Sequence, residues 1–139
     1  MRYLSIILIS LSTLTGCSYQ LALTPRDGTA PGIGRAQQLT SDTGTLELTI
    51  GDKTYSGTWA ASPAEDDYKL FKSHSSQRQG VLDNEALTDP LLNSGALANG
   101  LLRASDGSNL RCQFRYGANV GYGVCQDDDE KIYDFRITR

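Results

Sequence analysis

Between residues 45 and 59, hydrophobic and polar side chains alternate on both sides of a short turn. Large apolar residues occupy every second position of residues 46–50, and Tyr55 and Trp59 continue the alternation after a Gly-Asp-Lys turn at residues 51–53. A period of two places successive side chains on opposite faces of a strand, and a Gly-Asp pair favours a tight turn. The pattern predicts a β-hairpin.

The same order of strand, acidic turn and strand occurs twice more. Residues 101–116 predict a second hairpin around a turn at residues 105–109, and residues 122–137 predict a third around the acidic turn at residues 127–130. Three hairpins in succession predict an all-β fold, an antiparallel meander of six strands that forms a small barrel or a sandwich.

The second and third hairpins are predicted to pair with each other in a register that their cysteines define. If residues 110–116 and 122–126 are adjacent antiparallel strands, the residue numbers of each facing pair add up to 237, and Cys112 lies opposite Cys125. Directly opposite residues are close enough for a cross-strand disulfide. The same register sets Phe114 over a glycine of the neighbouring strand, a stabilising pair because the ring covers bare backbone. We therefore predict one disulfide, Cys112–Cys125.

Two regions lack such a pattern. Residues 17–44 are broken by prolines and glycines and predict a tether, with short strands around residues 19–23 or 33–39 as the alternative. Residues 73–100 are polar or ambiguous in period and predict a mobile loop. The β-domain is then residues 45–139.

The N-terminus has the three-part layout of a secretory signal. A positive charge at Arg2 precedes an apolar run over residues 4–14, and small residues lead to Cys17. The run has 11 residues, whereas a membrane-spanning helix needs about 20. Residues 1–16 are therefore predicted to be a signal peptide.

The motif Leu14-Thr15-Gly16-Cys17 resembles the lipobox of bacterial lipoproteins. The resemblance implies cleavage before Cys17, a diacylglyceryl group on its thiol and an acyl chain such as palmitate on its amine. Two or three chains anchor a protein stably, so the membrane would be a partner through this lipid. In the lipoproteins that this motif resembles, Asp after the cysteine favours retention in the inner membrane, so Ser18 implies the outer membrane; inner-membrane anchoring is the alternative. The domain would face the periplasm.

Charge and cysteine usage agree with export. The chain has a formal net charge of −3 at pH 7 and no basic patch, which argues against nucleic-acid binding. With Cys17 lipidated, Cys112 and Cys125 remain as an even pair in an oxidising compartment, where disulfides form.

The sequence contains no catalytic or metal-binding constellation that stands out. His74 is the single histidine and lies in a polar, loop-like stretch, where a rigidly held base is least expected. The carboxylates at residues 127–130 lack the spacing of a calcium loop and favour a solvated turn. We expect no enzymatic activity, no metal site and no cofactor.

Aromatic side chains provide the remaining candidates for binding. Those on predicted strands are Tyr55, Trp59, Phe114, Tyr116, Tyr122, Tyr133 and Phe135. Most are expected in the core. Tyr55, Trp59 and Tyr122 are the candidates for an exposed surface that binds a glycan or another protein.

The C-terminal part, with Gly123-Val124-Cys125-Gln126-Asp127 followed by Ile132-Tyr133-Asp134, resembles small uncharacterised proteobacterial lipoproteins. This resemblance implies a discrete all-β unit. We expect a non-enzymatic lipoprotein that binds an envelope protein or glycan, or supports the envelope. One alternative is an inhibitor of a cell-wall hydrolase, similar to the small lysozyme-inhibitor lipoproteins, which are also lipid-anchored, β-rich and disulfide-bonded. The other is an enzyme of unknown type.

Overall fold

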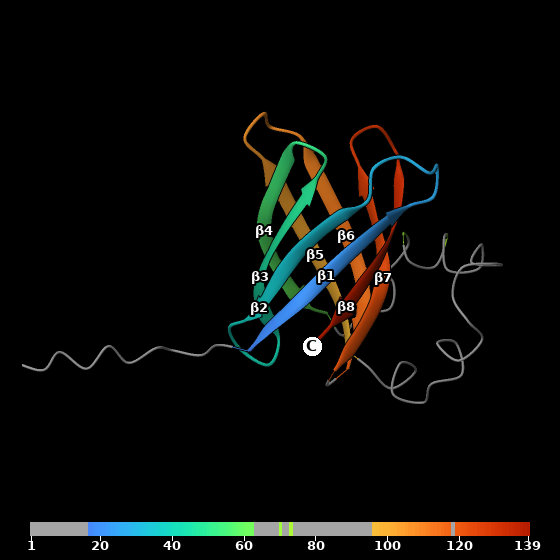
Figure 1. The fold of residues 1–139 in the computed structure, drawn as a ribbon. Coiled ribbons are helices and arrows are strands. Elements are labelled where there is room, and N and C mark those ends of the chain that lie inside the picture. The colour runs from blue at the N-terminus through green and yellow to red at the C-terminus, as the bar shows by residue number, and fades with distance from the viewer. Residues whose placement is uncertain (1–16, 63–69, 71–72, 74–95, 118) are drawn as a thin grey trace, which may run out of the picture.

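The computed structural model describes residues 17–62, 70, 73, 96–117 and 119–139. Within these residues, eight antiparallel strands follow one another around a closed barrel, and β1 pairs with β8 to close it (Figure 1). The strands are β1 (Ser18–Pro25), β2 (Gly32–Gln38), β3 (Thr43–Ile50), β4 (Lys53–Ala61), β5 (Ala96–Ala104), β6 (Asn109–Tyr116), β7 (Val120–Asp127) and β8 (Ile132–Thr138).

The predicted fold class is confirmed, and so are the three hairpins. They correspond to β3–β4, β5–β6 and β7–β8, each joined by a short polar turn. At the first turn Ile50 pairs with Lys53, so only two residues connect the strands, and Gly51 has a φ of 61°. Glycine adopts this left-handed conformation without steric cost, as two-residue hairpins require. The predicted number of six strands is wrong, because the barrel has eight.

The two additional strands come from the region that was expected to be a tether. Most of residues 17–44 forms β1 and β2, which pair with each other and with β8 and β3. The strand alternative within this region is the correct one. In β2 the inward positions hold the small residues Gly32, Gly34 and Ala36, while the large apolar Ile33 points outward and is 72% exposed. In β2, small residues therefore face the interior and a large apolar residue faces solvent. Because the usual alternation of large apolar and polar residues is absent, the sequence pattern does not predict this strand.

The expected loop at residues 73–100 is shorter at its C-terminal end than predicted. Strand β5 begins at Ala96, so residues 96–100 belong to the barrel. Residues 74–95, including His74, lie outside the described residues.

At many positions of the barrel interior, a small residue of one strand faces a large residue of the next. Gly34 lies opposite Leu21 of β1 and Leu48 of β3, and a Cβ atom at Gly34 would lie 2.8 Å from Leu48 Cδ2. The interior of an eight-stranded barrel is just wide enough for side chains to fill it. Large residues on every strand would therefore not fit.

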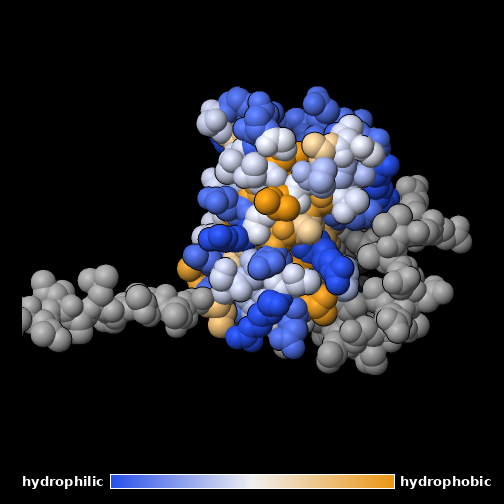
Figure 2. All heavy atoms as spheres, in the orientation of Figure 1, coloured by the Kyte–Doolittle hydropathy of each residue, from blue (hydrophilic) through white to orange (hydrophobic). Residues whose placement is uncertain are grey.

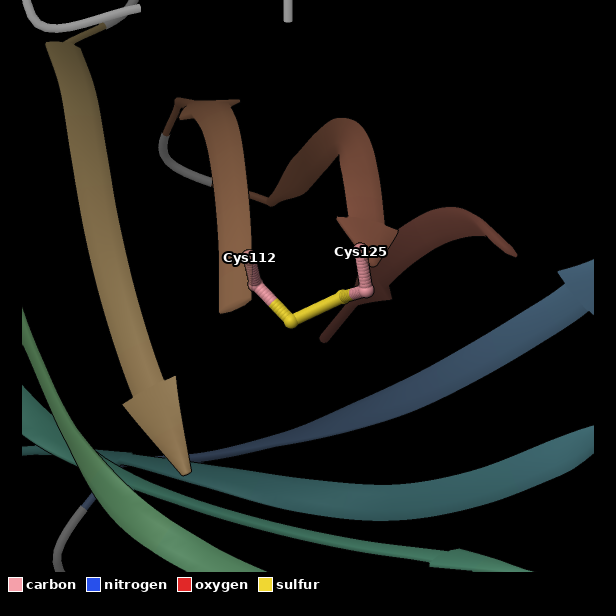
Figure 3. Close-up of a disulfide and its surroundings, with 2 residues drawn as sticks. All are labelled: Cys112 and Cys125. Carbon is pink, nitrogen blue, oxygen red and sulfur yellow. A yellow bond between two sulfur atoms is a disulfide. The ribbon is translucent and has the colours of Figure 1, made fainter. Parts of the chain in front are cut away.

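The predicted register between β6 and β7 is confirmed. Cys112 pairs with Cys125, Phe114 with Gly123 and Tyr116 with Gly121. The two cysteines form a disulfide with a Cα–Cα distance of 4.0 Å (Figure 3). Both are fully buried in the apolar core.

The outer face of the barrel is mostly polar. On the side shown in Figure 2, hydrophilic residues dominate, with separate hydrophobic patches between them. The large hydrophobic side chains that are most exposed are Ile33 (72%), Leu39 (65%) and Leu101 (59%). In the described part of the chain, no helix has the length and apolar character to cross a bilayer.

The register predicts that Gly123 tolerates no side chain. A Cβ atom there would lie 2.2 Å from the Gln113 carbonyl oxygen and 2.4 Å from Phe114 Cβ. Since the carbonyl belongs to a paired strand, Gly123→Val should lower the free energy of unfolding in urea by about 1–3 kcal/mol or more. Ala60→Val, at an exposed position of β4, is the control and should change it by less than about 0.5 kcal/mol. Equal stability of the two variants would contradict the pairing of Phe114 with Gly123.

Candidate functional site

The two ends of the barrel differ in construction. At the turn end, short turns at residues 26–31, 51–52, 105–108 and 128–131 connect the hairpins. At the opposite end, here called the open end, the described residues are Cys17, the β2–β3 connection at residues 39–42, the end of β4, the start of β5, Gly117 and Arg139. Most of the chain between β4 and β5 lies outside the described residues. Figure 1 shows the start of β1 and the C-terminus together at this open end.

An apolar depression, here called the cup, occupies the open end of the barrel. It is lined by Tyr19, Ala36, Gln38, Leu46, Trp59, Phe114, Tyr116, Gly117 and Ile137. Measured out to its mouth, the cup has a volume of about 380 Å³, but the free space inside it is only about 30 Å³. That space holds about one or two water molecules. The cup is therefore shallow and suits a ring edge or the end of a chain.

Three aromatic rings form one wall of the cup. Trp59 meets Tyr116 edge-on with ring centroids 5.1 Å apart, and Phe114 lies 6.1 Å from both. Such edge-on and tilted pairs are favourable because the positive edge of one ring faces the negative face of another. The rings hold one another in place across β4 and β6.

The rim of the cup is polar because the tyrosines place their hydroxyl groups there. Tyr116 donates a hydrogen bond to the Ser41 carbonyl (3.1 Å), and Tyr19 donates one to Gln38 Oε1 (3.4 Å). Each tyrosine thus has an apolar ring against the cup and a polar tip at its edge. The cup combines an apolar floor with a hydrogen-bonded rim.

The residues predicted to form a binding surface are not brought together. Tyr55 and Trp59 are buried inside the barrel, and only Trp59 lines the cup. Tyr122 is half-buried on β7, where the Arg136 guanidinium lies 5.8 Å from its ring centroid. Sequence reasoning missed Tyr19, because β1 was assigned to a tether. The alternation of Tyr19, Leu21 and Leu23 with smaller or polar residues is the signal that could have revealed it.

Cys17, the predicted lipidation site, is exposed and directly precedes β1. The Nη2 atom of Arg139, at the end of β8, lies 3.6 Å from its Sγ atom. Cys17 therefore sits at the open end, beside the strand that closes the barrel.

The carboxylates at the turn end stabilise turns. Asp127 Oδ1 accepts hydrogen bonds from the backbone N–H groups of Asp129 (3.0 Å) and Lys131 (2.9 Å). Asp128 Oδ2 accepts one from the Asn109 backbone N–H (2.7 Å), which joins two neighbouring turns. These contacts agree with the interpretation of residues 127–130 as a hairpin turn. The described residues contain no group of three or more metal-ligating side chains.

Two ion pairs add to this network. Lys53 lies 2.9 Å from Asp106, and Lys131 lies 3.3 Å from Asp27. Hydrogen bonds from Ser108, and then the Lys53 ammonium, hold the pKa of Asp106 well below its usual range. Hydrogen bonds from Thr29, assisted by Lys131, also lower the pKa of Asp27. Because these carboxylates are exposed, the pairs order the turns more than they stabilise the fold.

Comparison with known proteins supports the barrel fold but assigns the chain to no family. No family model matches the chain, and no curated protein matches it. Among solved structures, the chain is similar to a redesigned β-barrel, mFAP1, bound to DFHBI. The similarity covers 89% of this chain and 94% of that one, with a TM-score of 0.52 and 13% sequence identity. At this identity the similarity concerns the fold alone.

Tyr133 gives the turn end a measurable pH dependence. Burial of its ring, together with the nearby Asp127 carboxylate, raises the pKa of Tyr133 from 10 to about 12. Below pH 10 both the folded and unfolded states keep this proton. Between pH 10 and 12 the unfolded state releases it first, so the free energy of unfolding falls as pH rises, by at most about 3 kcal/mol from this group.

Urea unfolding on both sides of this pH range, in the native chain and in Tyr133→Phe, measures the effect. The variant should lose less stability than the native chain, because it has no proton to release at this position. An identical loss in both proteins would show that Tyr133 titrates normally.

Proposed function

We propose that the protein is a non-enzymatic binding module of the bacterial envelope, anchored by lipid on Cys17 and facing the periplasm from the outer membrane. Residues 1–16 would be its signal peptide. The observation that carries this proposal is the placement of the lipobox cysteine. It is exposed and lies immediately before the first strand, so cleavage before Cys17 would leave the whole barrel intact.

The chemistry of the cup supports a binding role. Its lining consists of aromatic and aliphatic side chains, one amide and a glycine. Such a surface binds by removing apolar area from water, and it contains few groups that could transfer a proton. The similarity to mFAP1, which is bound to DFHBI, supports the idea that a barrel of this form can carry a binding site.

Inhibition of a cell-wall hydrolase is the second candidate. It is favoured by the turn end, where ordered acidic turns lie opposite the proposed anchor and could meet a basic enzyme. Purified protein would slow the digestion of cell-wall material in this case. Unchanged digestion by cationic lysozymes and by amidases would remove the candidate.

Lipidation is tested by replacing Cys17. The Cys17→Ala chain should remain an uncleaved precursor and take up no labelled palmitate, since the thiol that receives the diacylglyceryl group is gone. Ser18→Ala, at the next position, is the matched control and should be cleaved and labelled like the native chain. A Cys17→Ala chain that is still cleaved and labelled would contradict the proposal.

A further inference from the structure

The barrel begins without a spacer after the proposed lipid attachment site. Strand β1 starts at Ser18, the residue that follows Cys17, and Ser18 already pairs with Gln37. Consecutive Cα atoms are about 3.8 Å apart. Acyl chains on Cys17 would therefore hold the open end of the barrel against the membrane surface instead of letting the domain stand away from it.

The open end has the side chains that suit such a position. Leu39, in the β2–β3 connection, is 65% exposed at this end. Tyr19 and Tyr116 lie at the rim of the cup with their rings inward and their hydroxyl groups hydrogen-bonded at its edge. Tyrosines with this division between ring and hydroxyl favour the boundary between headgroups and acyl chains.

Among the described residues, the charged side chains at the two ends of the barrel differ in a way that favours the same orientation. Carboxylates gather at the turn end, where Asp27, Asp52, Asp106, Asp127, Asp128, Asp129 and Glu130 outnumber Arg26, Lys53, Arg103 and Lys131. At the open end, the described residues include Arg115 and Arg139 against the carboxylate of Asp42. Anionic headgroups attract arginines and repel carboxylates, so they favour contact with the open end.

We propose that the open end of the barrel lies on the bilayer and that the cup receives the end of one acyl chain from it. The inference rests on the proposed lipid anchor at Cys17. The free space in the cup suits a chain end, and its aromatic wall supplies the apolar contacts. The turn end, with its acidic turns, then points away from the membrane.

The chain contains its own reporter, because Trp59 is the single tryptophan and lines the cup. The lipidated protein is reconstituted in vesicles of phosphatidylethanolamine and phosphatidylglycerol, with acyl chains either brominated or unmodified. Interfacial amphipathic helices bury their apolar face roughly 5–10 Å into the boundary region. At a similar depth of the open end, Trp59 should lose emission to the bromines. Tryptophan emission that is the same in both kinds of vesicle would overturn the proposal.

Three variants locate the contact. Trp59→Phe combined with Asp52→Trp moves the reporter to the turn end and should show no loss of emission. Leu39→Asp should reduce the loss seen with Trp59, whereas Leu101→Asp, an equally exposed leucine of β5 on the barrel wall, should leave it unchanged. A loss of emission from the turn-end reporter, or equal effects of the two leucine variants, would contradict the orientation.

Flotation of the vesicles and palmitate labelling separate the two proposals. If the protein carries palmitate and floats with the vesicles but Trp59 is not quenched, the lipid anchor stands and the proposed orientation is wrong. A protein without palmitate refutes the anchor, and the inference falls with it.

Discussion

The limited interior of a closed eight-stranded sheet is the constraint on which this structure depends. The interior is just wide enough for side chains to fill it, so many of the large inward residues have a small residue beside them on a neighbouring strand. Phe114 lies between Ala98 of β5 and Gly123 of β7, and Leu48 lies beside Gly34 of β2. The Cys112–Cys125 disulfide occupies one of these inward pairs. The closure of the barrel, the register of its strands and the sizes of its core residues therefore depend on one another.

Closure also decides where the functional elements lie. Because β1 pairs with both β2 and β8, Cys17 is brought beside Arg139 at the open end. The same end has the cup around Trp59, where the packed core meets the surface. The hairpin turns and their carboxylates occupy the opposite end. The proposed anchor site at Cys17, the apolar cup and the acidic turn end thus follow one axis, which is the basis for the proposed orientation on a membrane.

How much of this the sequence could predict depends on the size of the inward residues. In β3, β4, β6 and β8, large inward side chains alternate with polar ones, so the pattern revealed the hairpins, and two cysteines defined a register. In β2 the inward positions hold Gly32, Gly34 and Ala36, and Ile33 faces out. No rule about hydrophobic period identifies such a strand, because its role is to leave room for its neighbours. The cup was missed for a related reason: Tyr19, Trp59 and Tyr116 come from three strands that only closure brings together.

Hydrogen exchange of the β1 backbone amides tests the account most directly. In the closed barrel, Leu21 pairs with Gly34 on one side and with Ile137 on the other, and Leu23 pairs with Gly32 and Phe135. Amides held within the barrel exchange only when it opens. The account predicts that β1 exchanges as slowly as the β6–β7 hairpin with its disulfide. Exchange of residues 18–25 at the rate of an unstructured peptide, with β3–β8 protected, would show that this segment is a tether and would remove the basis for placing Cys17 at the open end.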